Sequence, residues 1–194
     1  MNKNIYNIKV GFLQTNCWIT PLEQENNCAE IPEGFSASIV VDPGEEANRI
    51  IALLNQHKLY PLYIILTHGH FDHTGAVKHL VKEYDTQVAI HKDELYDNIK
   101  PDIFLCEGDK IGNFTVLHLP GHSKGSIGLL DEKAGILFSG DTLFCDGYGR
   151  TDLPGGNTAQ LFASLNRLFA LDGSIKVYPG HDETTTIGEE ISKN

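Results

Sequence analysis

The feature that most constrains this chain is a cluster of titratable side chains in the segment LTHGHFDHTGAV at residues 66–77. Three histidines and one aspartate fall within six consecutive positions there, after an apolar run and before a segment with helical apolar spacing. A buried polar group without a partner costs free energy, so a core accepts such a cluster only if each member is paired. We therefore expect the rest of the chain to supply partners that make this crowding favourable.

The partners are expected where predicted strands end. In open α/β sheets, functional sites form beyond the carboxyl ends of strands, where several loops meet. Histidine and aspartate recur at that position in four parts of the sequence. They are His68, His70, Asp72 and His73 after the strand at 62–67, His122 after 114–120, Asp141 after 135–140, and His181 after 175–178. We predict that these seven side chains converge on one site.

The order of the predicted elements indicates a layered α/β fold. Short apolar or alternating segments are typical of strands, and apolar residues at i, i+3 and i+4 are typical of helices. The strands are 5–10, 17–20, 37–42, 62–67, 87–91, 114–120, 126–131, 135–141 and 175–180, and the helices are 45–58, 75–84 and 158–171. A polar stretch at 21–35 is expected to be an exposed loop. Because no linker divides the chain, we expect one domain over residues 1–194, with helices outside the sheets.

The composition argues against some classes of partner. The formal net charge of −11 disfavours nucleic acid or an anionic membrane as a partner, because both select Lys and Arg. The first residues, MNKNIYNIKVGF, lack the apolar stretch of a signal peptide, and no run approaches membrane-spanning length, so a cytoplasmic location is expected. The cysteines show no paired spacing and are expected to be reduced thiols: Cys17, Cys28, Cys106 and Cys145.

Five imidazoles and two carboxylates form a typical set of metal ligands. Without cations, neighbouring carboxylates would repel each other, whereas divalent ions make the crowding favourable. Seven ligands exceed what one tetrahedral ion takes and suit two ions. In an extended backbone His68 and His70 point to the same side, whereas the adjacent Asp72 and His73 cannot point the same way and can address a different ion. Asp141, with two carboxylate oxygens, can bridge.

The motifs THGHFDH, PGHSKGS, SGDTLF and YPGH, with VVDPG at 40–44 before them, resemble those of the metallo-β-lactamase superfamily and occur in the same order. The resemblance implies a four-layered αβ/βα sandwich with the metals in a shallow groove at one edge of the packed sheets. It also implies a division of the ligands. His68, His70 and His122 would hold one ion, Asp72, His73 and His181 the other, and Asp141 would bridge them together with a water or hydroxide.

Within that superfamily, GDTLFCDGYGRTDLPGG and YPGHDETTTIGEE resemble the glyoxalase II group, the hydroxyacylglutathione hydrolases, in particular its short single-domain bacterial members. Full-length enzymes of the group carry a helical C-terminal region that helps to bind glutathione, whereas thirteen residues follow His181 here. Where those enzymes have a glutathione-contacting Lys and, two positions later, a contacting Tyr, this chain has Arg150 and Asp152. The resemblance therefore implies thioester cleavage and leaves the thiol open.

We expect hydrolysis of a small-molecule thioester by hydroxide held between two divalent metal ions, with zinc as the first choice and iron or manganese as alternatives. A bound divalent ion lowers the pKa of water from ~15.7 to about 7, which supplies hydroxide at neutral pH. Asp72 is the candidate catalytic residue, because it can orient this nucleophile. Arg150 is a candidate for binding a substrate carboxylate, and Tyr148 for lining the groove.

Other functions share parts of this pattern. Persulfide dioxygenases resemble the chain through the same H-x-H-x-D-H motif and a GRTD segment, and would place one iron on His68, His122 and Asp141. A lactonase would share the dinuclear site. An RNA-processing nuclease is disfavoured by the acidic charge and the missing extra domain, and a scaffold role by the complete ligand set. The oligomeric state is not readable from the sequence.

Several other residues have a functional and a structural interpretation. Asp42 either supports a ligand loop or is an ordinary turn residue. Ser123 and Lys124 either touch substrate or shape a turn. Cys145 is a fourth ligand, a redox-sensitive thiol or a bystander. The remaining histidines are interpreted as structural or surface residues: His57, His79, His91 and His118.

Overall fold

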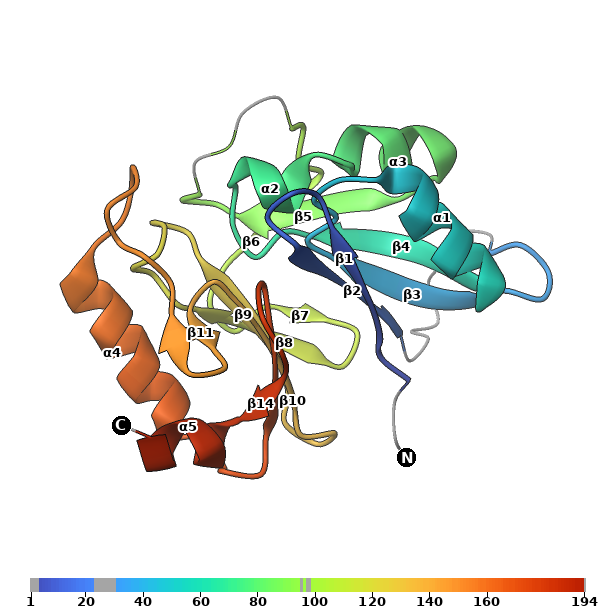
Figure 1. The fold of residues 1–194 in the computed structure, drawn as a ribbon. Coiled ribbons are helices and arrows are strands. Elements are labelled where there is room, and N and C mark those ends of the chain that lie inside the picture. Colours follow the sequence, from blue (N-terminus) through green and yellow to red (C-terminus); the bar gives the residue numbers. More distant parts are fainter. Residues whose placement is uncertain (1–3, 23–30, 95, 97–98, 194) are drawn as a thin grey trace.

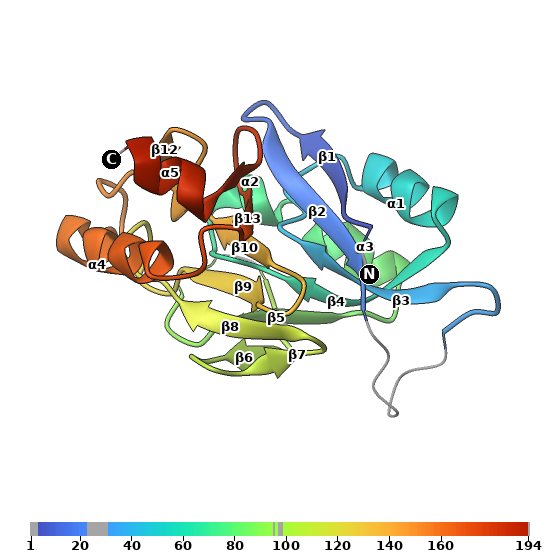
Figure 2. The same cartoon turned by 90° about the horizontal axis from the view of Figure 1, so that it is seen from below.

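The computed structural model describes residues 4–22, 31–94, 96 and 99–193. Within these residues the strands form two six-stranded sheets and one two-stranded sheet, and helices lie on the outer faces of the large sheets (Figure 1 and Figure 2). The four-layered αβ/βα architecture expected from the sequence is confirmed. Residues 23–30 of the predicted loop, including Cys28, lie outside the described residues.

The first sheet contains strands of the N-terminal half in sequential order. They are β1 (Tyr6–Val10), β2 (Thr15–Pro21), β3 (Ser36–Val41), β4 (Leu59–Ile65), β5 (Gln87–His91) and β6 (Ile103–Leu105). The pairs β1–β2 and β2–β3 are antiparallel, and those from β3 to β6 are parallel. The apolar runs of β3 and β4 suit this arrangement, because strands in a parallel region are covered on both faces.

The second sheet is built from the C-terminal half. In spatial order its strands are β14 (Thr185–Thr186), β13 (Lys176–Pro179), β10 (Ile136–Gly140), β9 (Ile127–Asp131), β8 (Phe114–His118) and β7 (Lys110–Ile111). The pair β10–β13 is parallel and the other pairs are antiparallel. A short hairpin of β11 (Leu143–Phe144) and β12 (Gly147–Tyr148) follows β10. The parallel pair points the loops after β10 and β13 in one direction, and both loops carry predicted site residues.

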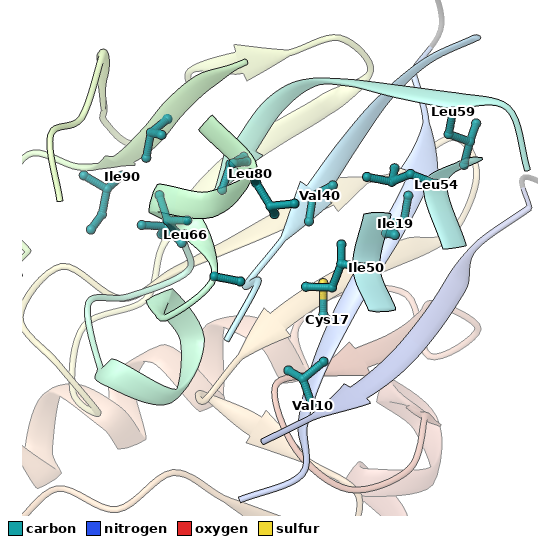
Figure 3. Close-up of a cluster of buried hydrophobic side chains, with 14 residues drawn as sticks. Val10, Cys17, Ile19, Val40, Ile50, Leu54, Leu59, Leu66, Leu80 and Ile90 are labelled. Atoms are coloured by element: carbon teal, nitrogen blue, oxygen red, sulfur yellow. The ribbon is translucent and has the colours of Figure 1, made fainter. Parts of the chain in front are cut away.

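Two helices cover each sheet, on opposite sides of the molecule (Figure 1). They are α1 (Ala47–Gln56) and α3 (Val77–Glu83) on the first sheet, and α4 (Thr158–Phe169) and α5 (Ile187–Lys193) on the second. Ile50 and Leu54 of α1 are four residues apart, so both face the sheet, where they pack with Val40 (Figure 3). In α4, Leu161 and Leu165 repeat this spacing. No helix in the described part of the chain is long and apolar enough to span a membrane.

The core between the two sheets fixes their relative position. Ile39 and Ile65 of the first sheet pack with Phe114 and Phe138 of the second, and all four side chains are fully buried. Trp18 of β2 joins this core and donates from Nε1 to the carbonyl oxygen of Pro179 at 2.8 Å. The two halves of the sequence are therefore held in register at the ends of the strands that precede the site.

The local structure differs from the sequence prediction in two places that affect the site. Strand β4 begins at Leu59, three residues before the predicted start, because its register with β3 shifts between Ser38 and Ile39 and accommodates the segment around Pro61. The residues that follow His70 form a single helical turn, α2 (Phe71–Thr74), ahead of the predicted helix. This turn changes the direction in which two of the predicted ligands point.

Candidate metal centre

The loops after β4, β8, β10 and β13 meet beyond the carboxyl ends of these strands, and the structure brings all seven predicted side chains together there. They fall into two groups of three with one carboxylate between them. The first group is His68, His70 and His122, the second is Asp72, His73 and His181, and the intervening residue is Asp141.

In the first group the possible ligand atoms all lie within 4.8 Å of one another. Nε2 of His122 lies 2.9 Å from Nδ1 of His70. The other ring nitrogen of His122, Nδ1, is 2.8 Å from the carbonyl oxygen of Arg150. A carbonyl oxygen only accepts, so Nδ1 of His122 carries the proton and the Nε2 lone pair of the neutral ring points at the group.

His68 is oriented in the same way through a hydroxyl group. Thr67 Oγ1 donates to Oδ2 of Asp42 at 2.6 Å, and it therefore accepts from Nδ1 of His68, which lies 3.1 Å away. The lone pair of His68 is thus on Nε2, an atom that is buried and has no hydrogen-bond partner among the described residues. A buried lone pair facing other nitrogen ligands is an arrangement that a metal ion would satisfy.

The second group is as compact as the first. Oδ2 of Asp72 lies 3.4 Å from Nε2 of His73 and 3.2 Å from Nε2 of His181, and the two ring nitrogens are 3.4 Å apart. The expectation that Asp72 and His73 point different ways is wrong. Neighbouring residues of a helical turn such as α2 are rotated by about 100°, not placed on opposite sides as in a strand, so both side chains reach one group.

Asp141 lies between the two groups. Its Oδ2 is 3.6 Å from Nε2 of His122 and 3.6 Å from Nε2 of His181, and its Oδ1 is 3.4 Å from Nε2 of His73. Oδ1 is buried without a hydrogen-bond partner in the described part of the structure. Gly180 leaves room for this carboxylate, because a Cβ at that position would be 2.2 Å from Oδ1. A carboxylate in this place can bridge two cations.

The electrostatics of the second group favour positive charge. Burial alone would lower the pKa of His73, but the carboxylates of Asp141 and Asp42 outweigh it and raise the pKa to about 9. Burial raises the pKa of Asp141. Burial also opposes ionisation of Asp72, yet hydrogen bonds from His181 and Thr15 and the charge on His73 hold its pKa well below the usual range. The proton kept by His73 is one that a divalent cation would replace.

Two histidines of the first group, His68 and His70, favour the neutral imidazole form. Burial, followed by the neighbouring rings of His122 and His73, lowers the pKa of His70 to about 4. Burial and the surrounding histidines also lower the pKa of His68 well below its usual value. Neutral imidazole is the form that coordinates metal, so these rings are ready to bind at neutral pH. The ligand types, the unpartnered buried atoms and the charges together fit divalent cations.

Two residues outside the predicted set also hold the ligands, and Asp42 takes the supporting role that was one of its two interpretations. Oδ1 of Asp42 accepts from the backbone N–H of Thr67 at 2.8 Å, and Oδ2 lies 3.0 Å from Nδ1 of His73. Thr15, at the start of β2, is buried and donates from Oγ1 to Oδ2 of Asp72 at 3.0 Å. A threonine that begins a strand carries no sequence signal for this role, so Thr15 was missed.

The side chains of Arg150 and Tyr148, the two predicted substrate-binding residues, contact residues outside the seven predicted ligands. The backbone carbonyl oxygen of Arg150 contacts His122. The Arg150 guanidinium is bound by Asp152 instead, with an Nε–Oδ1 distance of 2.7 Å and an Nη2–Oδ2 distance of 2.6 Å. Tyr148 packs edge-on against Phe162, with ring centroids 5.5 Å apart. It lines a cavity of about 460 Å³ between the β11–β12 hairpin, α4 and α5, and none of the seven predicted ligands lines that cavity.

Ser123, Lys124 and Cys145 also had a functional and a structural interpretation, and the structure gives their contacts. Ser123 is buried and hydrogen-bonded to Glu94 and Ser126, so it shapes the loop that carries His122. The Lys124 carbonyl oxygen lies 3.1 Å from Nε2 of His118. The Cys145 thiol forms a group with carboxylate oxygens of Asp146 and Glu190 that includes none of the seven predicted ligands, and burial followed by the Asp146 charge raises the pKa of this thiol.

Comparisons of the sequence and of the structure with known proteins agree on one family. The model of the metallo-beta-lactamase superfamily matches residues 33–181. The hydroxyacylglutathione hydrolase GloC of Haemophilus influenzae is 34% identical, over 88% of this chain and 92% of that protein. Among solved structures, TTHA1623 in a di-iron-bound form is 38% identical with a TM-score of 0.83, covering 97% of this chain and 98% of the other. ETHE1 from Myxococcus xanthus is 28% identical with a TM-score of 0.80, covering 96% and 81%.

Proposed function

The chain belongs to the metallo-β-lactamase superfamily, and we propose that it is a metal-dependent hydrolase that cleaves a small-molecule thioester at a centre for two divalent cations. The observation that carries the proposal is the arrangement of the seven side chains as two groups of three that share Asp141. In this proposal His68, His70 and His122 hold one ion. Asp72, His73 and His181 hold the other.

The bound ions would supply the reaction with hydroxide at neutral pH and with positive charge for the oxyanion that develops on the attacked carbonyl group. The protein's own contribution is orientation. Asp72 is held by Thr15, whose Oγ1 donates to Oδ2 at 3.0 Å, so the carboxylate keeps a fixed direction and can orient the nucleophile by accepting a hydrogen bond from it. The backbone of Arg150 and the Thr67–Asp42 pair keep His122 and His68 in the tautomers that bind metal.

The thioester substrate is supported by similarity to proteins named hydroxyacylglutathione hydrolases, GloC among them. The chain's formal net charge of −11 agrees with a small substrate and no nucleic acid. We propose zinc as the metal, with iron as the first alternative, because TTHA1623 was crystallised with two irons. Histidine and carboxylate ligands accept either metal.

The test is a substrate panel read together with metal content. Protein purified without added metal is analysed for metal and assayed with hydroxyacyl-glutathione thioesters, acyl thioesters of neutral thiols, lactones, phosphodiesters and persulfides, each with and without a chelator. We expect two metal ions per chain and chelator-sensitive turnover of thioesters. Turnover of lactones or phosphodiesters with inert thioesters would overturn the proposed substrate class, and turnover that persists without metal would overturn the proposed chemistry.

One second candidate is favoured by an observation, the similarity to ETHE1 at a TM-score of 0.80 and 28% identity. A persulfide dioxygenase would bind one iron through His68, His122 and Asp141, and His122 Nε2 and Asp141 Oδ2 are 3.6 Å apart. Metal counting separates the two candidates. One iron per chain with oxygen-dependent sulfite production identifies the dioxygenase, whereas two metals with thioester turnover identify the hydrolase.

A further inference from the structure

The loop that carries His122 is held from the first half of the chain by Glu94, which follows β5. The carboxylate oxygen Oε2 of Glu94 accepts from the backbone N–H of Gly125 at 3.0 Å and from Oγ of Ser123. Ser126 Oγ lies 2.6 Å from Ser123 Oγ and accepts from the Ser123 N–H at 3.1 Å. A Cβ on Gly125 would meet the Glu94 backbone at 2.5 Å, so the loop wraps closely around residue 94.

The loop that carries His181 is held in a corresponding way by Asn16 of β2. Asn16 is fully buried, and its side-chain amide Nδ2 donates to the carbonyl oxygens of Pro179 at 3.0 Å and Asp182 at 2.9 Å. Its backbone N–H donates to the Gly180 carbonyl oxygen at 2.7 Å. These hydrogen bonds fix the backbone on both sides of His181. They also hold Asp182 at a φ of 64°, a conformation that costs free energy for a residue other than glycine.

We propose that Glu94 and Asn16 are positioning residues, each for one ion of the centre: Glu94 for the ion of the three-histidine group and Asn16 for the ion of the group that contains His181. The inference rests on the two-ion centre of the proposed function. In each case a buried polar side chain of the first half fixes a loop of the second half, on which one ligand of that ion lies. Partners that orient metal ligands in this way typically change metal affinity by about 10- to 100-fold when they are removed.

The chemistry of the two contacts is opposite, which makes the inference testable with near-isosteric variants. Glu94 acts on its loop through an oxygen that only accepts, and Glu94→Gln keeps such an oxygen. Asn16 acts on its loop through the amide nitrogen Nδ2, which only donates. Asn16→Asp keeps the shape but places one carboxylate oxygen, in the position of Nδ2, against two carbonyl oxygens. We therefore expect Glu94→Gln to behave like the wild type and Asn16→Asp to behave like Asn16→Ala.

The experiment is titration of the chelator-treated protein with Co²⁺, followed by calorimetry and visible absorption. His122→Ala and His181→Ala serve as reference variants that mark the loss of one ion each. We expect the wild type to bind two ions. Glu94→Ala should bind one of them about 10- to 100-fold more weakly and give a spectrum like that of His122→Ala, and Asn16→Ala should match His181→Ala instead.

Asn7→Ala is the matched control for Asn16, because Asn7 Nδ2 donates to Asn16 Oδ1 at 3.0 Å without touching the ligand loop, so it should bind both ions normally. Thermal unfolding of each metal-free variant separates a lost fold from a lost ion. If the wild type binds two ions and Glu94→Ala and Asn16→Ala lose the same ion, lose both equally or lose neither, the inference is overturned while the proposed function stands. A wild type that binds one ion overturns both.

Discussion

Oδ2 of Asp42, the residue after β3, lies 3.0 Å from Nδ1 of His73, and the same oxygen accepts from Thr67 Oγ1 at 2.6 Å. One carboxylate therefore supports His73 directly and His68 through a hydroxyl group. The two rings belong to different groups of the centre. Asp42 has a φ of 53°, so the backbone turns sharply at the position from which it reaches both.

Replacement of Asp42 by asparagine tests this support. Asparagine tolerates the left-handed backbone of residue 42, but its amide nitrogen cannot accept from Thr67 or from His73. We expect Asp42→Asn to lower metal affinity about 10- to 100-fold, with both ions affected. Zn²⁺ titration of the chelator-treated variant measures this. Unchanged affinity for both ions would contradict the role assigned to Asp42.

Gly149 joins the β11–β12 hairpin to the centre by close contact. A Cβ there would be 1.9 Å from the Asp141 carbonyl oxygen and 2.9 Å from Nδ1 of His122, so Gly149→Ala should displace a ligand and cost about 1–3 kcal/mol of unfolding free energy. Gly147→Ala is the matched control in the same hairpin, because a Cβ there meets nothing within 4 Å. Urea unfolding and metal content are the measurements. Equal behaviour of the two variants would refute the contact.

The ion pair of Arg150 and Asp152 gives a test of the prediction that Arg150 binds a substrate carboxylate. Both side chains are more than 60% exposed, and exposed ion pairs are weak because solvent screens them. Asp152→Ala should therefore lower the KM for a thioester that carries a carboxylate by about 2- to 5-fold and leave the KM for a neutral thioester unchanged. Steady-state kinetics with both substrates decide this. A fall in KM for both substrates would point to a change other than release of Arg150.

His91 makes stability depend on pH away from the centre. It is buried and stacks on His118 with ring centroids 4.1 Å apart, and burial, followed by that neighbour, lowers the pKa of His91 below 6.5. As pH falls, the unfolded chain therefore binds a proton at His91 before the folded protein does. His91 costs no stability above pH ~6.5, and it lowers the free energy of unfolding as pH falls through the folded pKa. The loss is limited to about 1.4 kcal/mol per pH unit.

The His91→Phe variant keeps a stacked ring without a titrating group. Urea unfolding of both proteins at pH 7.5 and pH 5.5 measures the contribution, because the acid-sensitive ligands of the centre are the same in each. We expect the wild type to lose more stability than the variant on acidification. A larger loss in the variant would reverse the assigned sign.

Much of the architecture and the set of candidate side chains follow from local pattern. Apolar runs such as 62–67 identify strands, and His68, Asp141 and His181 each stand just after one. Because the carboxyl ends of strands lie together in an α/β fold, the position of these residues after strands is enough to predict that their side chains converge. The shared direction of Asp72 and His73 was not predictable in this way, because it depends on a single helical turn with no periodicity of its own.

Local pattern is enough to identify the side chains available for chemistry and the strand ends at which they stand. What holds these side chains depends on how the chain packs: Thr15 on Asp72, Asn16 on the His181 loop, Glu94 on the His122 loop, and Asp152 on Arg150. The first three contacts join residues far apart in the chain. A hydrogen bond depends on the distance and direction between two atoms, and for distant residues these are set by how the sheets pack, which no local spacing records.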